Sequence, residues 1–224
     1  MAKSYDEGFV EALMKHLLYH CKIPKVQVER ALGAILGLFI AGVLPPTLGD
    51  DLKMICAEFP LRKASRDISG CDQSTTSDGK QSTNIDWLLH SEKRDQLLFV
   101  ELKTADTGFR STQHQTYLRV IDRIRRGKSA SFLLADVVTI AKASRKRAKY
   151  AELLNCLDEQ YFQCDDARLV YLAPEAMVAA HSGRDDDRVE WLRFQDLRDI
   201  SPKFPAEWSA IRRHLAHLDS PAQD

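Results

Sequence analysis

Two acidic residues and a lysine form the part of this sequence best suited to chemistry. Asp86 lies in residues 84–89, and Glu101 and Lys103 lie at the end of residues 97–103. Both segments alternate between apolar and polar positions, which predicts two strands, and the short charged stretch between them predicts an antiparallel hairpin.

The turn of this hairpin fixes which residues face one another. Residues 90–96 form the expected loop, so its centre places Asp86 opposite or nearly opposite Glu101. Directly opposed residues share one face of a sheet, with Cβ atoms about 4.5–5.5 Å apart. The period of two then adds Phe99 and Lys103 to the face that carries Glu101.

Two carboxylates this close repel each other unless a cation lies between them. Mg²⁺ prefers one or two carboxylates together with waters and substrate oxygens, and Mn²⁺ can take its place. A metal-bound water beside Lys103 would suit hydrolysis of a phosphodiester. The alternative is an exposed polar face on which Lys103 forms a simple salt bridge.

The tripeptide that contains Glu101 and Lys103 is by itself weak support. The pattern Asp/Glu-x-Lys occurs three times, at residues 51–53, 78–80 and 101–103. Only residues 101–103 end an apolar strand that follows a strand with its own acid. The inference therefore depends on this context.

Asp86 followed by Glu101-x-Lys103 resembles the PD-(D/E)xK nuclease superfamily, which has a restriction-endonuclease-like core of helix, three strands, helix and strand. The resemblance covers residues 26–140. It implies that Asp86 and Glu101 are metal ligands, helped by the Leu102 carbonyl, and that Lys103 positions or activates the water.

Gln113 and Tyr117 resemble a Gln-x-x-x-Tyr motif that some branches of this superfamily carry on the next helix, where the pair lines the active site. The two residues are four apart and share a helix face. The alternative is that Tyr117 belongs to an apolar stripe with Ile121 and Ile124 and packs on the sheet.

The match departs from the superfamily pattern in two ways. Asn84 and Ile85, rather than a proline, precede Asp86. A further acid often completes the site. Of the candidates Glu29, Asp50, Asp51 and Glu58, we prefer Glu58, because its strand is expected to pair near that of Asp86.

We expect a single α/β domain with a mixed central sheet flanked by helices and with an N-terminal helical extension. Residues 1–45 would be helical, residues 46–140 would form the nuclease-like core, and residues 141–224 would add a basic helix, further strands and a C-terminal helix. The expected helices are 26–43, 111–126, 139–163 and 208–218, and the further expected strands are 56–62 (an edge strand, because of Pro60), 131–138, 168–172 and 188–194. Ser111 or Thr112 would cap the helix 111–126, and residues 65–82 would form a loop.

The charge is balanced overall, with 32 basic and 32 acidic residues, but it is unevenly distributed. Residues 117–149 hold ten basic residues and only two acids. Such a block can bind phosphates, although solvated helix faces would look the same. The candidate nucleic-acid-binding residues are Arg119, Arg123, Arg126, Lys142, Arg145, Lys146, Arg147 and Lys149.

Composition excludes several classes of protein. The five cysteines include no CxxC pair, so neither a zinc site nor a disulfide framework is indicated. The apolar stretch 31–44 is shorter than the about 20 residues that span a bilayer, and the N-terminus lacks the apolar region of a secretory signal. We expect a cytoplasmic protein without membrane contact.

These observations predict a Mg²⁺-dependent nuclease with nucleic acid, expected to be DNA, as its substrate. The alternative is a catalytically silent nucleic-acid-binding or assembly subunit whose chemistry lies in a partner. A homodimer or a partner protein is compatible with both interpretations.

Overall fold

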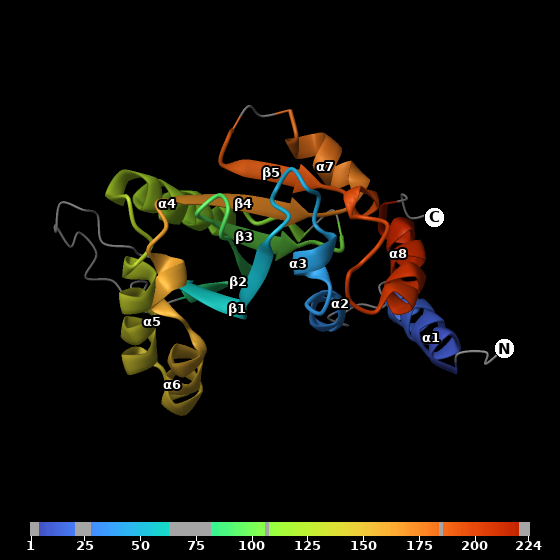
Figure 1. Ribbon diagram of the computed structural model, residues 1–224, viewed down its shortest axis with the longest axis horizontal. Coiled ribbons are helices and arrows are strands. Elements are labelled where there is room, and N and C mark those ends of the chain that lie inside the picture. Colours follow the sequence, from blue (N-terminus) through green and yellow to red (C-terminus); the bar gives the residue numbers. More distant parts are fainter. Residues whose placement is uncertain (1–4, 21–27, 63–81, 106–107, 184–185, 220–224) are drawn as a thin grey trace. The chain divides into compact units, whose positions relative to one another are not determined.

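The structure is a computed structural model that describes residues 5–20, 28–62, 82–105, 108–183 and 186–219. It is an α/β fold in which helices flank a five-stranded mixed sheet with the order β1-β2-β3-β4-β5 (Figure 1). The strands are β1 (Leu52–Arg62), β2 (Ser82–Ser91), β3 (Gln96–Leu102), β4 (Asp166–Leu172) and β5 (Val189–Leu192). The predicted fold class is confirmed at this level.

The helices are α1 (Tyr5–His20), α2 (Val28–Leu36), α3 (Ile40–Val43), α4 (Ser111–Gly127), α5 (Phe132–Ala143), α6 (Arg147–Cys156), α7 (Glu175–His181) and α8 (Pro205–Asp219). Two short 3₁₀ helices, η3 (Glu159–Phe162) and η4 (Phe194–Asp196), complete the described elements.

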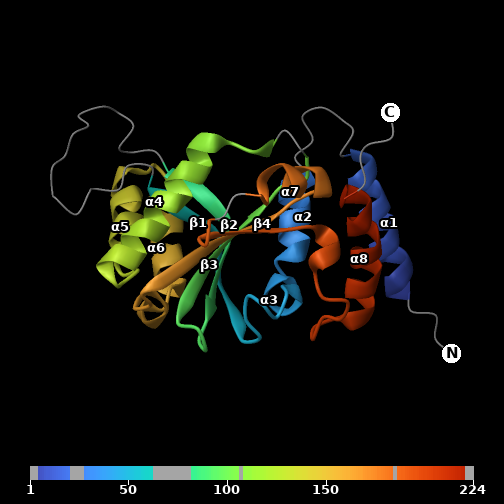
Figure 2. The same ribbon diagram turned by 90° about the horizontal axis from the view of Figure 1, so that it is seen from above.

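The chain divides into two compact units. The first comprises residues 1–52, 101–109 and 170–224, and in it α1 lies along α8 (Figure 2). The second comprises residues 53–100 and 110–169, and in it α5 lies against α6. Each unit has buried apolar side chains of its own, such as Trp208 in the first and Trp87 in the second.

The predicted hairpin of β2 and β3 is confirmed. The strands are antiparallel, and their pairs run from Ser91 with Gln96 to Trp87 with Val100. The turn is shorter than predicted and is closed by the Asp95 amide, which donates to the Glu92 carbonyl over 3.3 Å. Every residue of β3 is buried, so its polar side chains must find partners inside the protein.

β4 and β5 extend the sheet beyond β3. Gln96 bonds Asp166 near the start of β3 and β4, and the Lys103 amide donates to the Leu172 carbonyl over 2.8 Å at their other ends. Contacts that advance along both strands together show that β3 and β4 are parallel. The Ala173 amide likewise donates to the Leu192 carbonyl over 2.9 Å, which links β4 to β5.

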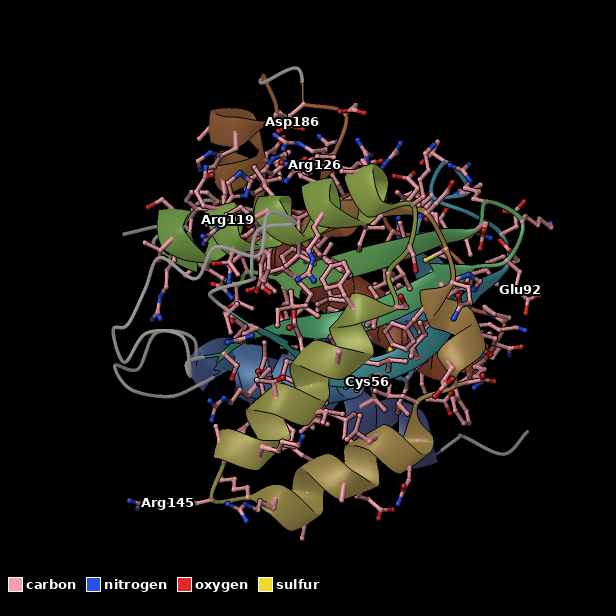
Figure 3. The ribbon with its side chains drawn as sticks, turned by 90° about the vertical axis from the view of Figure 1, so that its left-hand side faces the viewer. Cys56, Glu92, Arg119, Arg126, Arg145 and Asp186 are labelled. Atoms are coloured by element: carbon pink, nitrogen blue, oxygen red, sulfur yellow. The ribbon has the colours of Figure 1, made fainter. Side chains whose placement is uncertain are left out.

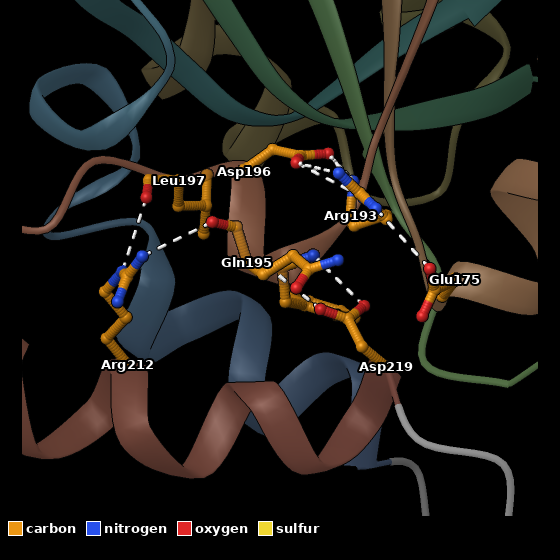
Figure 4. A network of polar contacts seen from close by, with 8 residues as sticks. Glu175, Arg193, Gln195, Asp196, Leu197, Arg212 and Asp219 are labelled. Carbon is orange, nitrogen blue, oxygen red and sulfur yellow. Dashed lines mark hydrogen bonds and ion pairs between the residues drawn. The ribbon is translucent and has the colours of Figure 1, made fainter.

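A polar network holds the end of β5 in place (Figure 4). The Arg193 guanidinium bridges Asp196 (2.7 Å) and Glu175 (3.4 Å). The Asp219 carboxylate accepts the amides of Phe194 (3.2 Å) and Gln195 (2.9 Å), and burial raises the pKa of that carboxyl group. The network therefore fixes β5 to α7, η4 and α8.

Two predicted elements are wrong. Residues 131–138 form most of α5 instead of a strand, and the predicted helix 139–163 is divided among α5, α6 and η3. The buried positions Leu133, Asp136, Val137 and Ile140 have helical spacing, which a short apolar run conceals. The strand that follows α4 along the chain is therefore β4, beyond three further helices.

Smaller differences concern helix ends. The predicted helix 26–43 is interrupted between α2 and α3, and α4 begins after Arg110 without a side-chain cap rather than with Ser111 or Thr112 as its cap. The edge position predicted for the strand with Pro60 is confirmed, since β1 ends the strand order. Residues 65–81 of the predicted loop lie outside the described residues.

Candidate functional site

Glu101 and Lys103 form a buried ion pair at the end of β3. Their side chains are 3% and 6% exposed, and the Lys103 ammonium donates to Glu101 Oε1 over 2.6 Å. They share a sheet face because they are two residues apart in an extended chain. A charged pair inside an apolar strand is costly unless its geometry is good, so it does not by itself explain stability.

The surroundings hold this pair on several sides. The backbone amide of Lys103 continues the ladder to Leu172. A Cβ at Gly108 would lie only 3.2 Å from Lys103 Cδ, so the chain passes close to the lysine stem. Burial, and then the Glu101 charge, raise the pKa of Tyr171. The Tyr171 phenol therefore stays neutral next to this carboxylate.

Asp86 lies half-buried on β2, directly before Trp87, which pairs with Val100. Asn84 shares its sheet face, and the Asn84 amide donates to Glu58 Oε2 over 3.1 Å. The exposed Glu58 has a φ of 53°, a left-handed conformation that costs a non-glycine residue about 1–3 kcal/mol. The acid preferred from the sequence thus lies beside the Asp86 strand on a strained backbone.

Gln113 and Tyr117 are bonded to each other on α4, where the Gln113 amide donates to the Tyr117 hydroxyl. The hydroxyl in turn donates to the Asn84 carbonyl over 2.7 Å. Tyr117 is fully buried in the stripe that also contains Ile121 and Ile124. Tyr117 therefore packs on the sheet, and its hydroxyl also holds β2 two residues before Asp86.

The oxygen-donor chemistry of these residues fits a hard divalent cation better than a softer one. Asp86, Glu101 and Glu58 offer carboxylates, and Leu102 offers a backbone carbonyl, which are the ligand types that Mg²⁺ and Mn²⁺ take. Within the described ranges, no group of three or more His, Cys, Asp or Glu side chains is gathered closely enough to hold a metal. Water and substrate oxygens would have to supply the remaining ligands.

The basic residues of α4 differ in whether their side chains are free of packing contacts and can reach phosphates. Arg119 and Arg126 are exposed on α4 (Figure 3), and their bonds to described residues go only to carbonyl or hydroxyl oxygens of their own helix. Arg123 is half-buried, lies 3.7 Å from the centroid of the Phe132 ring and approaches Asp136 at 3.7 Å. Arg123 therefore packs α4 against α5 and is poorly placed to reach phosphates.

Five further cations gather around the junction of α5 and α6. Arg145 lies in this turn and points away from both helices (Figure 3). All five side chains are exposed, and none forms an ion pair with a described residue. We call them the junction cations: Lys142, Arg145, Lys146, Arg147 and Lys149. They form a locally uncompensated positive segment, which is the electrostatic requirement for binding phosphates.

Sequence reasoning missed a group of aromatic residues in the unit that holds Glu101 and Lys103. Tyr171 and Trp191 stack with ring centroids 4.2 Å apart. His181 stacks on Trp191 at 4.8 Å, and Phe109 lies 4.5 Å from His181. Tyr171 and Trp191 stand on predicted strands, but their pairing depends on the strand order, which the sequence does not give.

Comparison with models of protein families, with curated proteins and with solved structures gives no match to this chain. Among the described residues, no helix is both long enough and apolar enough to cross a membrane.

Proposed function

We propose that this chain is a metal-dependent nuclease that hydrolyses phosphodiester bonds of DNA. The observation that carries the proposal is the buried pair of Glu101 and Lys103 at the end of β3. Burial of a carboxylate and an ammonium 2.6 Å apart inside an apolar strand costs folding free energy, which makes the pair a candidate for a functional role.

The hairpin register supports Asp86 as the second carboxylate. Asp86 directly precedes Trp87, which pairs with Val100. The spacing of the sequence predicts that Asp86 and Glu101 share one face of the hairpin, where two carboxylates can bind one cation. The match to the PD-(D/E)xK pattern, with its spacing between these residues, points to the same pair.

The proposed ligands are Asp86, Glu101 and the Leu102 carbonyl, with Glu58 as a further acid. A bound Mg²⁺ supplies a Lewis acid that lowers the pKa of a coordinated water. Lys103 would then hold and orient the attacking water through its ammonium hydrogens. Gln113 and Tyr117 would position the Asp86 strand, since the Tyr117 hydroxyl bonds the Asn84 carbonyl.

Contacts to the phosphate backbone would come from exposed cations. The junction cations, together with Arg119 and Arg126, have no carboxylate partner among the described residues. Affinity that depends on such contacts falls steeply as salt displaces the released counterions. A neutral protein can thus bind DNA through one local segment.

A second function is favoured by the same ion pair. Lys103 bonds Glu101 directly, as a purely structural pair would. A binding module with a silent site would keep the junction cations and would lose metal-dependent hydrolysis. The two functions therefore predict different results for cleavage and the same result for DNA binding.

The test incubates the purified protein with supercoiled plasmid and with single-stranded DNA, in Mg²⁺, in Mn²⁺ and in EDTA. Lys103→Met is run in parallel, because methionine keeps most of the lysine stem and removes the ammonium. Lys203→Met, at an exposed lysine, is the matched control. The proposal predicts metal-dependent cleavage by the wild type and by Lys203→Met, and none by Lys103→Met.

Salt-sensitive DNA binding without cleavage by any of the three proteins would favour the silent binding module. Equal cleavage by all three would place the active site elsewhere. Circular dichroism of Lys103→Met separates loss of chemistry from loss of fold.

A further inference from the structure

The sheet face that carries Glu101 and Lys103 continues into aromatic side chains. In a parallel ladder, the bond from the Lys103 amide to the Leu172 carbonyl pairs Lys103 with Ala173. Two residues earlier on both strands, Glu101 pairs with Tyr171. The influence of the Glu101 charge on the pKa of Tyr171 agrees with this pairing.

The same reasoning extends the row to β5. The Ala173 amide donates to the Leu192 carbonyl, and the rings of Tyr171 and Trp191 stack at 4.2 Å with planes only 15° apart, so Tyr171 lies beside Trp191. Glu101, Tyr171 and Trp191 therefore form one row across three neighbouring strands. With strands about 4.8 Å apart, Trp191 lies about 10 Å from Glu101 in the plane of the sheet.

The outer part of this row is partly open to solvent. Tyr171 is buried, whereas Trp191, His181 and Phe109 keep part of their surface exposed. His181 is nearly parallel to Trp191, at 12°, and Phe109 lies within 6.0 Å of both Tyr171 and Trp191. Flat rings next to a charged pair combine a surface for stacking with the polar chemistry that Glu101 and Lys103 provide.

We propose that the rings of Trp191, His181 and Phe109 form a stacking site for an unpaired base of the nucleic acid that is cleaved at Glu101 and Lys103. The proposal rests on the nuclease function and names its substrate class as single-stranded or locally unpaired DNA. Bases inside a duplex have both faces covered by their neighbours, whereas an unpaired base exposes a face that aromatic side chains can stack on.

Each stacked base contributes about 1–3 kcal/mol in proteins that bind single strands, which corresponds to about 5- to 150-fold in affinity. The contribution is tolerant of sequence, because every base has a flat face. The site would thus prefer unpaired over paired DNA and show no preference for base sequence.

Intrinsic fluorescence tests this directly. Trp87 and Trp208 are 1% and 0% exposed, whereas Trp191 is half-buried, so a base bound at the proposed site would quench Trp191. The protein in EDTA, which prevents cutting, is titrated with oligothymidylate and with a blunt duplex of the same length. We expect quenching by the single strand and little by the duplex.

Two variants sharpen the result. Because this variant lacks the reporting tryptophan, binding is measured by the fluorescence anisotropy of a labelled strand: Trp191→Leu should raise the Kd for the single strand about tenfold, in line with the loss of one stacked base, and leave the Kd for the duplex unchanged. Trp191→Phe, which keeps a ring, should stay near the wild type. Phe109→Leu changes a ring outside the sheet, and it tests the same loss of single-strand affinity if Trp191→Leu does not fold.

Absence of single-strand binding, absence of quenching on binding, or an equal loss of single-strand and duplex affinity in Phe109→Leu would overturn the stacking site. Because these titrations need no metal, they fail separately from the nuclease. Quenching without any cleavage in Mg²⁺ would contradict the nuclease function and support base stacking. Cleavage of duplex without single-strand quenching would support the nuclease function and contradict base stacking.

Discussion

The end of β3 and the junction of α5 and α6 use charge in opposite ways. Glu101 and Lys103 are buried and neutralise each other at 2.6 Å, whereas the junction cations (Lys142, Arg145, Lys146, Arg147 and Lys149) are exposed and share no ion pair with a described residue. A buried charge needs a partner, and an exposed one is stabilised by water. We infer that chemistry and affinity reside in different residues of this protein and can be removed separately.

The largest effect is expected from Lys103→Ala. Removal of one partner leaves the Glu101 carboxylate buried and uncompensated, which should lower the unfolding free energy by about 3–5 kcal/mol. Urea denaturation followed by circular dichroism measures this loss. In the double variant Glu101→Gln/Lys103→Met neither charge remains, so stability should return towards the wild-type value while cleavage stays absent.

If the double variant were as unstable as Lys103→Ala, packing rather than charge would explain the effect of the lysine. The contrast between the buried pair of Glu101 and Lys103 and the exposed junction cations would then not be explained by electrostatics.

Neutralising all five junction cations to glutamine should act on affinity alone. Exposed substitutions usually change stability by less than about 0.5 kcal/mol each, whereas each lost phosphate contact lowers the slope of log K against log salt by about 0.9. Fluorescence anisotropy with a labelled duplex at several salt concentrations measures the slope. Lys203→Gln with Arg213→Gln, at exposed positions elsewhere in the chain, is the matched control.

An unchanged salt dependence in the five-residue variant would show that phosphates are bound by other residues. Arg119 and Arg126 would be the next to test.

Tyr117→Phe probes the support of the Asp86 strand. The loss of the 2.7 Å bond from the buried hydroxyl to the Asn84 carbonyl should cost about 1 kcal/mol of unfolding free energy. Tyr150→Phe is the control, since the Tyr150 hydroxyl bonds no described residue. Equal stability of the two variants would contradict a positioning role for Tyr117.

Glu58 combines an exposed carboxylate with a strained backbone. Glu58→Gly and Glu58→Ala both remove the acid, but only glycine adopts the φ of 53° without steric cost. Glycine should therefore be the more stable variant by about 1 kcal/mol, and the two should lose the same fraction of cleavage if Glu58 is a ligand. Unequal cleavage would assign its effect to the backbone.

The sequence predicts the strand pair best where local patterns decide it. Alternation and turn length are sufficient for the register of β2 with β3, because both are properties of a short segment. The strand predicted for residues 131–138 was wrong because the local pattern there does not decide between a strand and a helix. A short apolar run fits a strand or a buried helix equally well, and only the buried positions of α5 show the helical spacing.

The row from Glu101 to Trp191 could not be predicted at all. It depends on β4 lying between β3 and β5, a contact between segments about seventy and ninety residues apart in the chain. The break between α5 and α6, which places Arg145 and Lys146 in a turn, was likewise not predicted, because the sequence predicts one continuous helix there.

The most direct test of the account is the rate of plasmid cleavage in Mg²⁺ by the wild type, by Asp86→Asn and by Glu207→Gln, which alters an acid at the start of α8 that is half-buried, as Asp86 is. Loss of groups that only support a metal ligand already costs about 10- to 100-fold, so we predict a fall of about 100-fold or more for Asp86→Asn. Glu207→Gln should match the wild type. Metal-dependent cleavage by Asp86→Asn at the wild-type rate would contradict the account, because Asp86 and Glu101 would then not share a cation.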